Sequence, residues 1–189
     1  MPSRSLTVWL TDRRNRLNEI ETACIGVATG AVPNSIFLEE SLRGFVMHLS
    51  AHYQGFCRDL YHESTQLCVA AIPIALRSAA QTQFLSQLVL EKSNPSYENI
   101  RRDFNRFGFI LNVQSMDSAA SGYLTDSSHL NDWRNRAAHQ AAHPFRGGVP
   151  NQLSLTLLQK WRMSCDRLTS LLDKALYDEL TRLLGANPW

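Results

Sequence analysis

The stretch "LSLTLLQKWRMSCDRLTSLLDKALYDEL", residues 153–180, indicates the fold class more clearly than any other part of the chain. Its apolar residues recur every three or four positions, which is the spacing of one face of an α-helix. The apolar stripe continues past the quoted stretch, and Gly185 then provides a natural terminator. Its members are Leu158, Trp161, Cys165, Leu168, Leu172, Ala175, Leu176, Leu180 and Leu183. The sequence therefore predicts a long amphipathic helix near the C-terminus.

The same spacing recurs along most of the chain, and convincing alternating strands are absent. Pro73 should break a long second helix that is capped by Asn34 or Ser35. Residues 109–126 are less regular, and residues 109–113 could form a brief extended piece. The other helices are expected over about residues 5–27, 74–92, 96–107 (capped by Asn94 and stopped by Gly108) and 127–142 (opened by Asp126 or Ser127). We therefore expect an all-α protein, an up-and-down helical bundle of five to six helices.

The composition is that of an ordinary globular protein. The 189 residues are 44% hydrophobic and 19% charged, and the net charge of +2 neither requires nor excludes a nucleic-acid partner. The chain has no pattern of a signal peptide and no run of about 18 apolar residues, so we expect a cytoplasmic protein without a membrane partner. The four cysteines form no CxxC pair and are expected to be buried free thiols.

A second stretch, "DWRNRAAHQ" at residues 132–140, carries the candidate chemistry. At about 100° per residue, Leu130, Trp133, Ala137 and Ala141 fall on one buried stripe of a helix. Asn135 and His139, four residues apart, share the opposite face, and Arg134 lies between the two faces. Within one chain Arg134 and His139 are poorly placed to hold the same atom, but two chains related by a two-fold axis could bring both pairs into one cleft.

These residue types suit the cleavage of a phosphodiester bond. Arg presents a planar fork of donors that matches phosphate oxygens, and neutral His exchanges a proton near pH 7. Together they provide charge stabilisation and proton transfer without a metal ion or other cofactor. The alternative is that these residues are simply the solvated face of a helix.

The segment "RNRAAH" matches the R-N-x-x-x-H motif of the HEPN superfamily of helical ribonucleases. The context is similar too, because a long helix ("SLRGFVMHLSAHYQGFCRDLYHES") precedes the motif helix and an amphipathic terminal helix follows it. The chain most resembles the bacterial HEPN group found beside toxin–antitoxin and defence genes, including those associated with RiboL-PSP proteins. The resemblance covers about residues 35–184, so we expect one HEPN-like domain over residues 1–189, with an additional N-terminal helix.

This resemblance implies a homodimer with a composite active site, acting as a metal-independent endoribonuclease. The ribose 2′-OH would attack, leaving a cyclic phosphate and a 5′-OH. His139 would be the general acid/base, Arg134 would bind the scissile phosphate, and Asn135 would orient the histidine or the phosphate. A toxin or defence effector of this kind implies an antitoxin or another regulatory protein as partner. The alternative is a catalytically silent HEPN-like module for dimerisation and for binding RNA, a nucleotide or a protein.

The chain departs from the superfamily pattern at two points. A Tyr lies two residues after the His in the subset silenced by AMPylation, whereas this chain has Ala141, so that regulation is not expected. Many relatives place an acidic residue in the earlier long helix, facing the site. Here the corresponding stretch offers Gln54 or His52, and Asp59 only later.

Further residues are candidates for binding RNA. In "NIRRDFNRFGF", Arg101, Arg102 and Arg106 alternate with Phe104, Phe107 and Phe109, and such a pattern can pair with phosphates and stack on bases. The alternative places the rings in the core and the arginines in water. Arg136 lies within the motif segment and His143 lies one turn after His139, and both could extend the RNA site. His48 and His52 have a spacing that metal ligands use, but no third ligand is evident, and we expect no metal site.

Overall fold

The computed structural model describes residues 1–30, 35–139 and 148–189, except for the side chains of Ser35 and His139. Helices are the only regular secondary structure of this described part, which contains no strand, and this confirms the all-α prediction. It contains more helical segments than the five or six expected. They are α1 (Arg4–Val8), α2 (Arg14–Thr29), α3 (Ser35–Ala70), α4 (Arg77–Leu85), α5 (Val89–Lys92), α6 (Tyr97–Phe104), α7 (Ala120–His139) and α8 (Leu155–Leu184).

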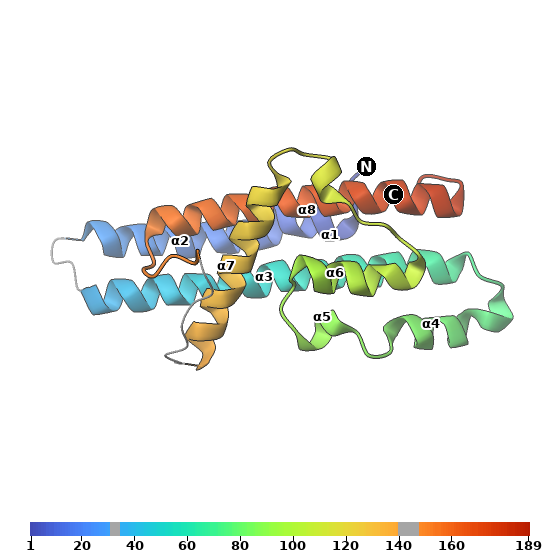
Figure 1. Ribbon diagram of the computed structural model, residues 1–189, viewed down its shortest axis with the longest axis horizontal. Helices are drawn as coiled ribbons and strands as arrows, with labels where there is room; N and C mark the ends of the chain where they lie inside the picture. Colours follow the sequence, from blue (N-terminus) through green and yellow to red (C-terminus); the bar gives the residue numbers. More distant parts are fainter. Residues whose placement is uncertain (31–34, 140–147) are drawn as a thin grey trace.

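Three long elements lie lengthwise side by side. A π-helical turn, Trp9–Arg13, joins α1 to α2, and this N-terminal rod packs with α3 and α8, whereas α7 runs steeply across them (Figure 1). The Trp9 ring is fully buried against Tyr53 and Phe56, and its Nε1 donates to Asp166 of α8 at 2.8 Å. The N-terminal helix therefore contributes to the same hydrophobic core as α3 and α8.

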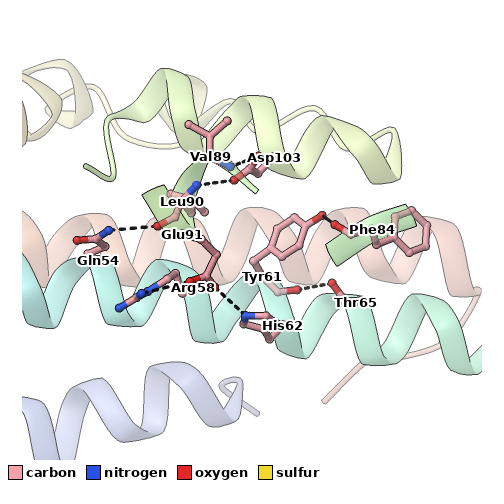
Figure 2. A network of polar contacts seen from close by, with 10 residues as sticks. All are labelled: Gln54, Arg58, Tyr61, His62, Thr65, Phe84, Val89, Leu90, Glu91 and Asp103. Atoms are coloured by element: carbon pink, nitrogen blue, oxygen red, sulfur yellow. Dashed lines mark hydrogen bonds and ion pairs between the residues drawn. The ribbon is translucent and has the colours of Figure 1, made fainter. Parts of the chain in front are cut away.

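The expected helix over residues 74–92 is wrong, because the chain breaks it between α4 and α5. Gln87 adopts the left-handed conformation with φ of 53°. The buried Asp103 accepts from the N–H groups of Val89 and Leu90, which opens α5 (Figure 2). Arg106 donates to the carbonyl groups of Gln83, Phe84, Ser86 and Gln87. Side chains distant in the sequence thus satisfy the backbone groups that a continuous helix would have paired.

The predicted capping residue of one helix and the predicted start of another are also wrong. Ser96, rather than Asn94, caps α6, since its Oγ accepts from the N–H of Asn99 at 3.2 Å. The helix α7 begins at Ala120, before the expected Asp126 or Ser127. Both of these residues are buried, and Asp126 accepts from Ser164 and Lys160 of α8, so it forms a helix–helix contact instead of a cap.

Other expectations are confirmed. Gly108 and Gly185 follow their helical segments in the left-handed conformation, with φ of 75° and 70°. All four cysteines are free and buried, and burial raises the pKa of Cys68 to about 11. The brief extended piece suggested for residues 109–113 is not found as a strand, and Val113 begins a 3₁₀ turn. None of the helices described for this chain combines the length and the hydropathy needed to cross a bilayer.

Candidate functional site

The motif helix α7 is anchored through its predicted apolar face. Leu130 and Trp133 are buried, and the Trp133 Nε1 donates to the carbonyl of Pro150, just before α8, at 2.9 Å. Ala137 is half-buried, while Ala141 lies outside the described residues. The buried face positions the rest of the motif at the surface.

Arg134 and Asn135 lie where the periodicity predicts. Arg134 is half-buried and Asn135 is exposed. Nη1 of Arg134 donates to Oδ1 of Asn135 at 3.3 Å, and Nδ2 of Asn94 donates to the same oxygen at 2.8 Å. A guanidinium and an amide therefore lie next to each other, beside the turn between α5 and α6.

His139 of the motif lies at the edge of the described residues, and His143 lies beyond them. The backbone of His139 ends α7, one helical turn after Asn135, but its side chain is outside the described residues, as is all of His143. The predicted roles of His139 and His143 thus stay predictions.

Arg136 contacts other residues than Arg134 and Asn135 do. Its guanidinium lies over the Trp133 ring, 5.4 Å from the centroid, and it lines a cavity of about 420 Å³. The other residues lining this cavity come from the start of α3, from α7 and from the segment before α8: Leu38, Glu39, Leu42, Arg43, Trp133, Asn151, Gln152 and Leu153. Arg136 therefore belongs to a recess beside α3, whereas Arg134 and Asn135 meet the α5–α6 turn.

The arginines of α6 and of the 3₁₀ turn that follows it, Asn105–Phe107, differ in their contacts. Arg101 and Arg102 are exposed, and Arg101 lies over the Tyr97 ring at 5.7 Å. Arg106 is engaged with the α4–α5 link. Phe104 and Phe109 are buried, and Phe107 packs between them and Phe84, so these rings are core residues. Arg101 and Arg102 thus remain the accessible cations of this segment.

In the stretch of α3 that could face the site, Gln54 binds the turn between α5 and α6. Its Nε2 donates to the carbonyl groups of Leu90 at 3.1 Å and Ser93 at 3.0 Å (Figure 2 shows the first). Asp59 instead pairs with Arg13. Gln54 thereby fixes the turn that carries Asn94, a residue for which the sequence indicated only a capping role.

His52 lies on the other side of α3 from this turn, against the N-terminal rod. Nη1 of Arg13 donates to its carbonyl at 3.0 Å, and partial burial, then Arg13, His48 and Arg16, lower the pKa of His52. In the described part of the chain, no three His, Cys, Asp or Glu side chains lie close enough together to hold a metal ion.

No protein-family model matches this chain, and no curated protein or solved structure shows significant similarity to it.

Proposed function

We propose that this chain is a metal-independent endoribonuclease of the HEPN type, acting as a homodimer on RNA. The observation that carries the proposal is the contact between the half-buried Arg134 and the exposed Asn135, on a helix whose inner face is buried. A guanidinium fork beside an amide donor suits a phosphate group, and both side chains are accessible to a large substrate. The HEPN-like arrangement of the helices is part of the same proposal.

The reaction needs only proton transfer and charge stabilisation. A histidine accepts the proton of the ribose 2′-OH, whose oxygen attacks phosphorus, and the bond from phosphorus to the 5′-oxygen breaks. The leaving oxygen takes up a proton, and the products are a 2′,3′-cyclic phosphate and a 5′-OH. Arg134 would stabilise the charge that develops on the phosphoryl oxygens, and His139 would transfer the protons.

A second copy of the chain completes the site in this proposal. Residues 134 and 139 point in different directions on one helix, since they are five positions apart at about 100° per residue. A two-fold axis near α7 would place Arg134 of one chain opposite His139 of its partner. Arg101, Arg102 and Arg136 would then bind the phosphates on either side of the scissile bond.

Such an activity has consequences for the host cell. An enzyme that cleaves cellular RNA in the cytoplasm arrests growth, which fits a toxin or a defence effector. An antitoxin or another regulatory protein would then hold it inactive. The composite site offers a direct means, because a partner that separates the two chains would also separate the catalytic groups.

The test is cleavage of a mixed RNA in the presence of EDTA, with identification of the product ends. We expect EDTA-resistant cleavage that leaves cyclic phosphates, and loss of cleavage in His139→Ala and Arg134→Ala. His129→Ala, on the same helix, and Arg167→Ala, exposed on α8, are the matched controls and should cleave normally. Equal cleavage by the wild type and His139→Ala would refute the proposal.

The shared site has its own test. Mixing Arg134→Ala chains with His139→Ala chains should restore activity in one of the two sites of each mixed dimer, which neither variant shows alone. A mixture as inactive as its components would contradict a composite site. If the wild type binds RNA and cleaves none at high concentration, the alternative of a silent RNA-binding module is correct.

A further inference from the structure

The Asn135 side chain has a defined orientation in this structure. Its Oδ1 accepts from Nδ2 of Asn94 at 2.8 Å and from Nη1 of Arg134 at 3.3 Å. A rotation of the amide by 180° would place its own NH₂ group against these two donors. The two contacts therefore direct Oδ1 toward Asn94 and Arg134, and Nδ2 to the opposite side of the amide.

Asn94 can impose this orientation because its turn is itself held from two sides. Its carbonyl accepts from Nδ2 of Asn99 and from the N–H of Ser96, both at 2.8 Å. Gln54 of α3 binds the carbonyl groups of Leu90 and Ser93, just before Asn94 (Figure 2 shows the Leu90 contact). A chain of amide groups thus runs from the core helix α3 to the exposed face of α7.

We infer that Asn94 is a positioning residue of the proposed ribonuclease, which holds the Asn135 amide so that Nδ2 donates to a phosphate oxygen of the RNA. This inference rests on the proposed function. Asn94 itself does not touch the RNA, and it acts through Asn135. Since only Nη1 of Arg134 is bound to Oδ1 of Asn135, the other N–H groups of the guanidinium and the NH₂ group of the amide are left to donate to phosphate oxygens of the RNA.

Two substitutions at position 94 distinguish positioning from a merely structural role. Asn94→Asp keeps the shape of the side chain but removes its donors, so the Asn135 amide must turn its NH₂ group inward to meet the new carboxylate. Asn94→Ala removes the contact without imposing the wrong orientation. Positioning predicts that Asn94→Asp is the worse of the two. A merely structural role predicts similar kcat values for the two variants, because both lose the hydrogen bond from Nδ2 of Asn94 to Asn135.

The readout is kcat and KM on one RNA oligonucleotide in EDTA. We expect kcat to fall about tenfold in Asn94→Ala and about a hundredfold in Asn94→Asp, with KM changed much less. Ser93→Asp places the same charge in the same exposed turn without facing Asn135, and should leave kcat within about twofold. In an Asn135→Ala background, Asn94→Ala should have no further effect on kcat.

A second measurement does not depend on catalysis. The thermal unfolding of Asn94→Ala, Asn135→Ala and the double variant should be non-additive, because the single variants remove the same hydrogen bond. Additive unfolding data would overturn the inference even if the wild type cleaves no RNA. Cleavage by the wild type together with normal kcat in Asn94→Asp would overturn the inference and leave the proposed function intact. A wild type without cleavage would refute the proposed function, and with it the role toward RNA.

Discussion

Arg106 and Arg134 both lie in stretches that combine arginines with aromatic residues and an asparagine, but their guanidinium groups have different partners. Arg106 follows α6 and donates to four carbonyl groups of the α4–α5 link, beside the buried carboxylate of Asp103. Arg134 is half-buried, between the inner and outer faces of α7, and within the described residues it donates to the amide oxygen of its neighbour Asn135. A guanidinium whose donors are taken up by backbone carbonyls serves the fold, whereas one beside a side-chain amide at the surface is available to a ligand.

This difference predicts opposite consequences of substitution, and the largest should occur at Asp103. Asp103→Ala should lower the free energy of unfolding by about 3 kcal/mol, because the buried N–H of Leu90 and the part-buried N–H of Val89 lose their acceptor and Arg106 loses its neighbouring carboxylate. Unfolding in urea measures the effect. The exposed Asp12, replaced by Ala, is the control and should change the value by less than about 0.5 kcal/mol. If Asp103→Ala lowers the free energy of unfolding by less than about 1 kcal/mol, the segment between α4 and α5 does not depend on this carboxylate.

Arg106→Met should have the next largest effect. The substitution keeps the aliphatic stem and removes the donors to the four carbonyl groups. We expect a loss of about 1.5 kcal/mol, since the side chain is 29% exposed and water can replace part of what is lost. Arg102→Met, on the exposed face of α6, is the matched control for the same urea experiment. If Arg106→Met and Arg102→Met lower the free energy of unfolding equally, Arg106 is no more important to the fold than an exposed arginine.

Helical spacing predicted the long helices and the buried side of α7 well. Both depend on local periodicity, as the burial of Leu130 and Trp133 shows. Spacing failed at the α4–α5 link because the break there depends on Asp103 and Arg106, which reach back from a later segment. It failed at Asn94 for the same reason, since no pattern in the sequence connects this residue with Asn135. Contacts between distant segments carry these features, and a single sequence does not show them.

A smaller effect concerns His52, which lies on α3 beside the N-terminal rod. Partial burial and the positive charges of Arg13, His48 and Arg16 lower its pKa below the ordinary value of 6.5. The unfolded chain then binds a proton that the folded chain resists, so stability should fall as the pH drops below 6.5 toward the lowered pKa. Melting temperatures between about pH 7.5 and pH 5 measure this effect, and His52→Gln should flatten the decline. The same decline in both proteins would assign it to other groups.

The smallest effect on stability should come from the residue with the largest predicted role in function. Arg134→Ala should change the free energy of unfolding by less than about 0.5 kcal/mol, because its contact to Asn135 is exposed and water can replace it. The same variant should lower the rate of RNA cleavage by about a thousandfold, if the guanidinium stabilises the charge on the scissile phosphate. Arg134→Lys would separate charge from geometry, because an ammonium group keeps the charge but lacks the planar fork. We expect it to restore RNA binding more than cleavage. If Arg134→Ala instead lowers the free energy of unfolding as much as Arg106→Met does, both arginines stabilise the fold. Arg134 would then be a structural residue, and the proposed active site on α7 would be refuted.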